Sequence, residues 1–230
     1  MMKGIFKHIL LVFLCVWCLS STAQVINDAG LWTTLNFEKK INKKFAVLLT
    51  EEFRMRENIT RLNLFYTDLG ISYKPVDFFK ASISYRWIDK YQVEGYFSFR
   101  HRFSLDLLFK KKIENFSVSY RHRLQREVRD INSSYDGRLP EWYSRSKVEL
   151  KYDMGKRLTP YVSFEARYQI VNPRMQESDY AWHRSRYALG FNYELDKRNT
   201  LGAYYLIQNE YYVSSPQNQY IIGLEYSLSL

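Results

Sequence analysis

Apolar and polar residues alternate along most of this chain, in runs of about ten to fourteen residues, the length of a membrane-spanning strand. The clearest run covers residues 97–110. One set of alternate positions in it reads Phe97, Phe99, His101, Phe103, Leu105, Leu107 and Phe109, and the other reads Ser98, Arg100, Arg102, Ser104, Asp106, Leu108 and Lys110. A period of two residues predicts a β-strand with one apolar and one polar face.

The same pattern recurs from residues 31–37 to residues 220–230, and we count eleven such segments. Bacterial single-chain barrels have an even number of strands. We therefore expect about 12 strands, the additional one lying near residues 24–30 or 129–135. About ten strands are the alternative, if one segment lies outside the barrel wall.

The connections between these segments alternate in kind. One set is short and mostly basic: residues 39–44, 74–77, 110–115, 154–159 and 196–199. The other set tends to be longer or more polar: residues 130–141, 172–181 and 214–218. Tight periplasmic turns and longer outer loops are typical of outer-membrane barrels. The pattern predicts an all-β fold, a single antiparallel up-and-down transmembrane β-barrel.

Alternation alone does not say which face is buried, because a soluble lipocalin-like barrel would place its apolar face inside. The number of segments, the aromatic residues near strand ends and a last strand that reaches Leu230 favour a membrane barrel. Turning the 97–110 strand over would point Arg100 and Arg102 at lipid, which costs about 2–4 kcal/mol each near the midplane. We therefore expect the arginines to face the lumen.

The N-terminal segment has the pattern of an export signal. Lys3 and Lys7 precede an apolar stretch at residues 9–19, and Ser21-Thr22-Ala23 supplies small residues for cleavage. We expect a signal peptide at residues 1–23 and a barrel domain at residues 24–230. An uncleaved N-terminal anchor is the alternative, although the apolar stretch is short for a ~20-residue span.

Composition narrows the class of protein further. The 20 Tyr, 15 Phe and 5 Trp exceed what a disordered chain carries. Both cysteines, Cys15 and Cys18, fall in the signal segment, so the mature chain is expected to hold no disulfide and no thiolate metal site. The net charge of +10 does not point to nucleic acid, because the basic residues alternate with apolar ones and form no exposed patch.

Several short stretches resemble those of a known family: Gly30-Leu31-Trp32, Glu51-Glu52-Phe53-Arg54, Tyr96-Phe97-Ser98-Phe99-Arg100-His101-Arg102, Ser119-Tyr120-Arg121-His122-Arg123, Arg184-Ser185-Arg186-Tyr187 and Ile221-Ile222-Gly223-Leu224-Glu225-Tyr226. With these, nearly the whole mature chain resembles the domain of unknown function 2490 family, predicted outer-membrane β-barrel proteins. The resemblance implies the fold and the membrane, and no activity. Leu230 stands where such barrels usually end in an aromatic residue.

Tracing the strands back from a periplasmic C-terminus places a set of charged residues in the outer half of the lumen. The arginines are Arg54, Arg56, Arg86, Arg100, Arg102, Arg121, Arg123, Arg145, Arg167, Arg184 and Arg186; the acids are Glu52, Glu127, Glu149, Glu165 and Glu210. Guanidinium groups bind carboxylates in pairs of hydrogen bonds, so we expect paired acids with positive charge left over. Such a network would either fill the lumen or line a narrow anion-selective passage.

No constellation of catalytic or metal-binding residues stands out. The mature chain has three histidines; alternation places His101 and His122 on the lipid-facing side and His183 at a strand mouth beside Trp182. We interpret them as interfacial side chains with a polar tip. We expect no catalytic residues, no metal and no cofactor.

The sequence therefore predicts a non-catalytic integral protein of the outer membrane of a Gram-negative bacterium, with a structural or minor transport role. Its expected partners are outer-membrane lipids and, during insertion, the outer-membrane assembly machinery. A hydrolase of lipid or protein acting at the outer rim, and a narrow anion-selective pore, are the alternatives; a soluble periplasmic ligand-binding barrel is a third.

Overall fold

The computed structural model describes residues 26–92, 95–129, 138–155, 157–173, 180–212 and 216–230. The expected signal peptide and its cleavage site lie outside the described residues. Within the described ranges, no helix has the length and apolar character needed to cross a membrane.

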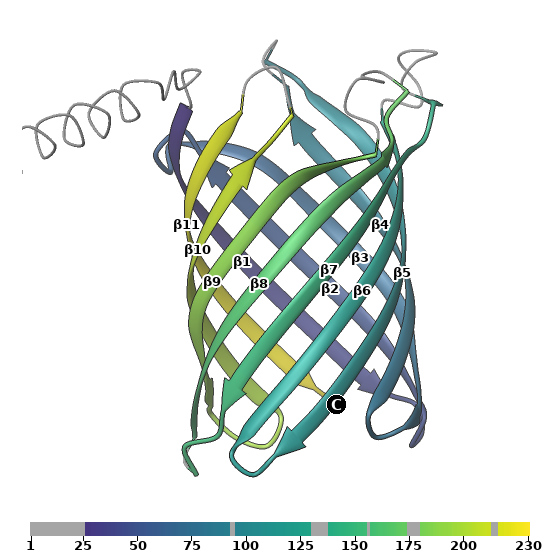
Figure 1. Cartoon of the computed structure of the whole chain (residues 1–230), viewed down its shortest axis with the longest axis vertical. Helices are drawn as coiled ribbons and strands as arrows, with labels where there is room; N and C mark the ends of the chain where they lie inside the picture. The colour runs from purple at the N-terminus through teal and green to yellow at the C-terminus, as the bar shows by residue number, and fades with distance from the viewer. Residues whose placement is uncertain (1–25, 93–94, 130–137, 156, 174–179, 213–215) are drawn as a thin grey trace, which may run out of the picture.

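The described residues form eleven strands. Their bounds are β1 (Ile26–Lys40), β2 (Phe45–Arg56), β3 (Arg61–Val76), β4 (Phe79–Tyr91), β5 (Phe97–Ile113), β6 (Phe116–Arg129), β7 (Glu141–Tyr152), β8 (Leu158–Val171), β9 (Ala181–Glu194), β10 (Asn199–Glu210) and β11 (Gln217–Ser229). Each strand pairs with its neighbours in chain order, and β1 pairs with β11, so the sheet closes into a barrel (Figure 1). Closure leaves no unpaired strand edge to be solvated in lipid.

The closing pair reflects the odd number of strands. β1 and β11 run parallel, with Leu31 opposite Ile222 and Leu35 opposite Tyr226, while the other neighbouring pairs are antiparallel. Because successive strands are antiparallel, an odd count makes the first and last strands parallel; the eleven strands lie between the expected 12 and the alternative of ten, and the barrel is mixed instead of purely antiparallel. Of the two regions proposed for a further strand, residues 26–30 belong to β1, and residues 130–135 lie outside the described ranges.

The parallel pair also separates the chain ends. β1 begins at the end of the barrel where the longer connections lie, and the C-terminus is at the opposite, short-turn end (Figure 1). Side chains stabilise the tight turns at that end: the Asn42 side chain accepts hydrogen bonds from the backbone N–H groups of Lys44 and Phe45 at 2.8 and 2.9 Å. We call the two ends the long-loop end and the short-turn end.

The outer face of the barrel is apolar. Large side chains point away from the lumen along the strands, and Ile83 and Leu189 remain 60% and 63% exposed. At the short-turn end, aromatic residues of neighbouring strands pair on this face, as in Phe45 with Tyr73 at 4.8 Å between ring centroids. An apolar band bordered by aromatic rings matches the hydrocarbon layer and its interfaces.

The inner face is mostly polar. The buried side chains include Glu52, Arg86, Gln125 and Glu165, whereas the buried apolar cluster is small: Trp32, Leu206 and Ile221. Charged pairs and hydrogen bonds, with little apolar packing, therefore fill the lumen.

Arg126 departs from the expectation that arginines face the lumen. It alternates with Gln125 and Glu127, which are buried inside, and it lines an apolar hollow on the outer face together with Trp142. Arg126 lies three positions before the end of β6 at the long-loop end. The cost of a cation on the lipid face falls to about 0–1 kcal/mol near the interface, which explains why this position tolerates an arginine.

Candidate functional site in the barrel lumen

The arginines and glutamates expected in the lumen lie on the inward-facing positions of their strands. In β5 these positions include Arg100 and Arg102, in β6 Arg121 and Arg123, and in β9 Arg186. Strand alternation produces this placement, because every second side chain of a barrel strand points inside. The structure then decides which of these charges meet.

Glu165 on β8 contacts three arginines. Its carboxylate accepts from Arg121 at 2.7 Å and from Arg186 at 3.2 Å, and it also pairs with Arg145. The three guanidinium groups come from β6, β7 and β9, and Glu165 is only 6% exposed. A single negative charge is thus shared by three positive ones.

A second centre lies nearer the long-loop end. Glu127 on β6 pairs with Arg100 at 3.2 Å and with Arg102, whose Nε lies 2.8 Å from Oε2. Arg129 reaches the same carboxylate at 3.6 Å and pairs with Glu141 at 2.6 Å. These contacts tie β5, β6 and β7 together on the inside of the barrel.

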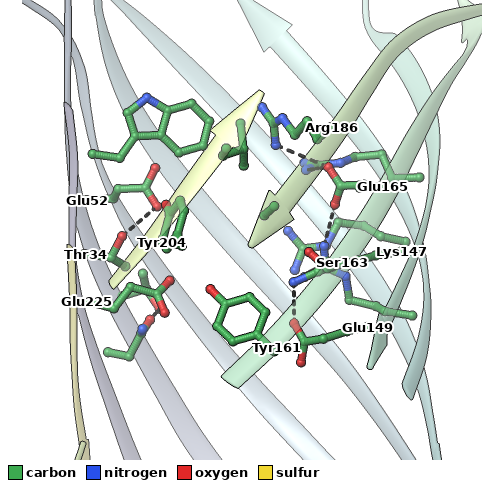
Figure 2. A pocket seen from close by; sticks show the side chains of 18 of the residues that line it. Thr34, Glu52, Lys147, Glu149, Tyr161, Ser163, Glu165, Arg186, Tyr204 and Glu225 are labelled. Carbon is green, nitrogen blue, oxygen red and sulfur yellow. Dashed lines mark hydrogen bonds and ion pairs between the residues drawn. The ribbon is translucent and has the colours of Figure 1, made fainter. Parts of the chain in front are cut away.

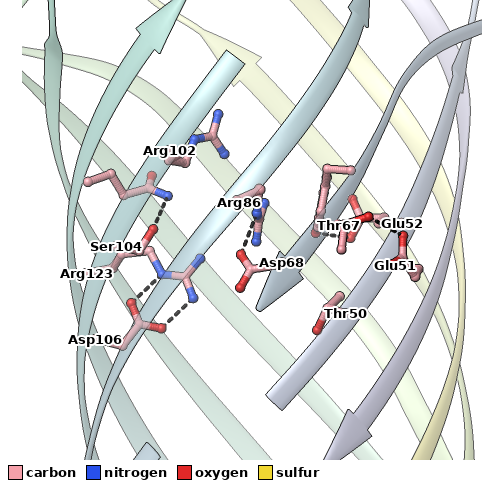
Figure 3. Close-up of polar contacts among 12 residues, drawn as sticks. Thr50, Glu51, Glu52, Thr67, Asp68, Arg86, Arg102, Ser104, Asp106 and Arg123 are labelled. Carbon is pink, nitrogen blue, oxygen red and sulfur yellow. Dashed lines mark hydrogen bonds and ion pairs between the residues drawn. The ribbon is translucent and has the colours of Figure 1, made fainter. Parts of the chain in front are cut away.

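Simpler pairs complete the network (Figure 3). Arg86 Nε donates to Asp68 Oδ2 at 2.6 Å, and Arg123 holds Asp106 with two hydrogen bonds. Glu52 pairs with Arg54 and accepts hydrogen bonds from two hydroxyl groups, Thr34 at 3.1 Å and Tyr66 at 2.7 Å. Bidentate and charge-assisted bonds of this kind hold side chains in fixed positions.

Some expected members stand apart from these centres. Arg56 contacts Glu57 at 3.4 Å in the connection after β2, and Arg184 pairs with Glu210. Glu149 pairs with Lys147 at 2.7 Å and Lys151 at 3.1 Å, where an arginine was expected. Among the described residues, Arg167 makes no ion pair.

Sequence reasoning missed several lumenal charges. Asp68, Asp106 and Glu141 each bind an arginine, and Lys147 lies on the same face. Strand alternation was sufficient to place Asp106, since it shares its face with Arg100 and Arg102. The partners depend on how neighbouring strands are staggered, which a single strand does not reveal.

Several lumenal guanidinium groups also stack on aromatic rings. The guanidinium carbon of Arg54 lies 3.7 Å from the centroid of the Trp32 ring, and that of Arg186 lies 5.1 Å from it. Arg86 stacks at 3.7 Å on Tyr66. These cation–π contacts add to the ion pairs that the same guanidinium groups make with Glu52, Glu165 and Asp68.

A cavity of about 320 Å³ lies in the lumen beside these pairs (Figure 2). Arg121, Arg145, Arg186 and Glu165 border it, together with Tyr161, Tyr204 and Glu225. A further hollow of about 370 Å³, lined by β1, β2, β11 and the turn before β10, shares Asn36 and Thr50 with it. The cavity therefore continues toward the short-turn end.

The histidines are divided between the two faces. His101 Nδ1 lies 2.6 Å from the Tyr85 hydroxyl and His122 Nδ1 lies 3.3 Å from Ser146 Oγ, on the outer face. His183 is 9% exposed and its Nδ1 lies 2.5 Å from Arg167 Nη2. A register shift after Arg167 turns His183 inward, so it is not the interfacial side chain expected from strand alternation.

Metal-binding groups do not gather in the described part of the chain: no set of three or more His, Cys, Asp or Glu side chains there could hold a metal ion. The histidine closest to the network, His183, contacts a guanidinium group and the edge of Tyr143. The described lumenal side chains supply ion pairs and hydrogen bonds.

Several solved structures align with most of this chain. The NanC porin aligns with a TM-score of 0.52 at 12% identity, over 88% of this chain and 98% of that one. A bacterial polysaccharide outer membrane secretin (TM-score 0.48, 11% identity) aligns over 82% of this chain and 63% of its own. The β domain of the Bordetella autotransporter BrkA (TM-score 0.48, 12% identity) aligns over 83% and 86%.

The likeness to the NanC porin concerns the fold alone, which is that of a porin-like β-barrel. This chain spans less than two thirds of the secretin. Among curated proteins none matches the chain. A family model described as "Protein of unknown function (DUF2490)" matches residues 29–229, which is almost the whole barrel. The chain therefore belongs to the DUF2490 family.

Proposed function

We propose that this protein is a non-catalytic outer-membrane barrel whose lumen is closed, in its long-loop half, by the arginine–carboxylate network. The sharing of Glu165 by Arg121, Arg145 and Arg186 is the observation that carries the proposal. Guanidinium groups from three strands converge on one carboxylate, and such paired side chains obstruct a narrow barrel. Its role is then structural, with at most minor transport.

The outer face supports a location in the outer membrane of a Gram-negative bacterium. Exposed apolar side chains such as Ile83 and Leu189 would be costly in water and are suited to lipid. The partners proposed on this basis are outer-membrane lipids and, during insertion, the outer-membrane assembly machinery. The surroundings of His183 support a role without catalysis, because its neighbour Arg167 is a cation and not a nucleophile that it could activate.

Recording across a planar lipid bilayer tests the closure. The wild-type barrel should show no steady current, and the double variant Arg145→Ser/Arg186→Ser, which removes two of the three cations around Glu165, should conduct. The matched control is Arg126→Ser/Arg157→Ser, which removes two arginines that lie outside the lumen. Gel mobility before and after boiling would show that each variant is folded.

Two results would contradict the closure. A steady current through the wild-type barrel would show that the lumen is open. A folded Arg145→Ser/Arg186→Ser barrel that stays closed would show that the arginines around Glu165 are not the barrier.

A narrow anion-selective passage is the second candidate, and one observation favours it. The three guanidinium groups around Glu165 leave net positive charge beside the cavity. Rings of positive side chains select anions. If the wild-type barrel conducts, its reversal potential in a salt gradient should show anion preference, and a cation preference would contradict both candidates.

A further inference from the structure

The walls of the lumenal cavity carry different charges. Lys147 and Arg186 lie on one side, and Glu225 lies on the other near Glu52, whose charge Arg54 offsets (Figure 2). The first side is formed by β6, β7, β8 and β9, and the second by β2 and β11. A polar molecule in the cavity would therefore meet opposite charges at its two ends.

The basic side has more positive charge than its acids neutralise. Among the residues that the structure describes, Arg121, Arg145 and Arg186 share a single carboxylate, that of Glu165. Closer to the short-turn end, Lys147 and Lys151 both pair with Glu149. One carboxylate offsets one cation, so each group leaves positive charge that an acidic ligand group would compensate.

The opposite side has a carboxylate without a partner. Within the described part of the chain, Glu225 makes no hydrogen bond or ion pair, although it borders the cavity. The hydroxyl group of Tyr204 on β10, and that of Tyr161 on β8 of the basic side, likewise make no hydrogen bond within the described ranges. Polar groups in a confined space favour a ligand that completes their hydrogen bonds. An ammonium group suits these oxygen acceptors because it can donate three hydrogen bonds.

Two glycines make room for these tyrosines. A β-carbon at residue 223 would lie 1.9 Å from Tyr204 Cζ, and one at residue 190 would lie 2.8 Å from Tyr161 Cζ. Because both positions are glycine, the two rings lie close against the barrel wall, and the space in front of them stays open. A cavity of about 320 Å³ accommodates a small organic molecule.

We propose that this cavity binds a small zwitterion, with its acidic group toward Lys147 and the arginines and its ammonium group toward Glu225. The proposal rests on the proposed function, in which the lumen is closed on the long-loop side and the cavity is reached from the short-turn end. The hollow that shares Asn36 and Thr50 with the cavity supplies this route.

Three probes of equal chain length test the proposal by isothermal calorimetry on the purified, folded barrel: 4-aminobutanoate, butanoate and butylammonium. The zwitterion should bind about tenfold more tightly than either singly charged probe, because only it compensates both walls. In Glu225→Gln this preference should disappear while butanoate binding is retained. The matched control, Glu51→Gln, changes a glutamate that contacts Thr67 outside the lumen and should keep the preference.

Each other outcome overturns the proposal. Butanoate as the tightest probe would indicate a simple anion site, butylammonium as the tightest a cation site, and binding of none of the three an unoccupied cavity. Calorimetry requires no current across a bilayer, so a barrel that conducts but prefers the zwitterion would refute the closure alone. A closed barrel without that preference would refute the zwitterion site alone.

Discussion

The ring of Tyr204 on β10 lies directly against Gly223 on β11, so closely that a β-carbon at residue 223 would be 1.9 Å from Tyr204 Cζ. Glycine is required here by the close approach of a ring. The contact keeps the tyrosine against the wall and thereby leaves the lumenal cavity open.

Gly223→Ala should therefore push the Tyr204 ring into the cavity and cost about 1–3 kcal/mol of unfolding free energy through overpacking. Urea unfolding in lipid vesicles measures the loss. Adding Tyr204→Ala should remove the clash and recover part of the stability. Gly190→Ala should cost more, because its β-carbon would lie 2.7 Å from the backbone oxygen of Ala203, which cannot rotate away. Equal losses for the two glycines would contradict this explanation.

Glu165→Gln should destabilise the barrel by about 3 kcal/mol, because it leaves three guanidinium groups without their shared negative charge. Glu149→Gln is the control, since its lysine partners are more exposed and closer to water. In a double-mutant cycle, Arg145→Met should cost less in the Glu165→Gln background than in the wild type. Additive losses would show that the two residues are not coupled.

The folded protein should migrate differently before and after boiling on a detergent gel. A closed barrel with complete backbone pairing resists the detergent until it is heated. The protein should also require detergent to remain in solution, because its outer face is apolar. Identical mobility combined with solubility in plain buffer would count against a membrane barrel.

Asp153, in the turn after β7, should titrate below its ordinary range. The backbone N–H of Gly155 and the ammonium group of Lys112 lower the pKa of its carboxyl group. A lowered pKa means that the stability due to Asp153 is fully present above the ordinary value of about 4 and is lost as the pH falls through the lower folded-state pKa.

Carbon-13 NMR titration of the Asp153 carboxyl group measures this pKa, and Asp153→Asn should reduce the acid dependence of unfolding. Asp77 offers a comparison, because the side chain of Lys74 lowers the pKa of its carboxyl group. A midpoint for Asp153 at or above about 4 would refute the prediction.

Mature protein isolated from membranes should begin at Gln24, because Ala23 is the small residue that closes the export signal. Intact-mass measurement distinguishes this end from a retained leader. A chain that still carries Lys3 would instead support the N-terminal anchor.

Local sequence was sufficient for the strands and their faces. Alternation with a period of two depends only on neighbouring residues, so it placed Arg100 and Arg102 on the face opposite Phe99 and Phe103 before any strand was paired. The same alternation predicted that nearly every arginine faces the lumen. Arg126 differs because its position near the interface weakens the penalty that keeps arginines away from lipid.

Only the tertiary structure decided how the strands meet. The barrel has an odd number of strands and closes by the parallel pairing of β1 with β11. These strands come from opposite ends of the chain, so no local sequence pattern predicts that they pair. A register shift beside Arg167 turns His183 inward, which strand alternation cannot anticipate. The stagger between neighbouring strands selects the partners of Glu165 and Glu149, because an ion pair forms only where two side chains reach the same height in the lumen. Alternation within one strand determines whether a side chain points into the lumen or toward lipid. Which side chains then contact each other depends on the register of all the strands that close the barrel.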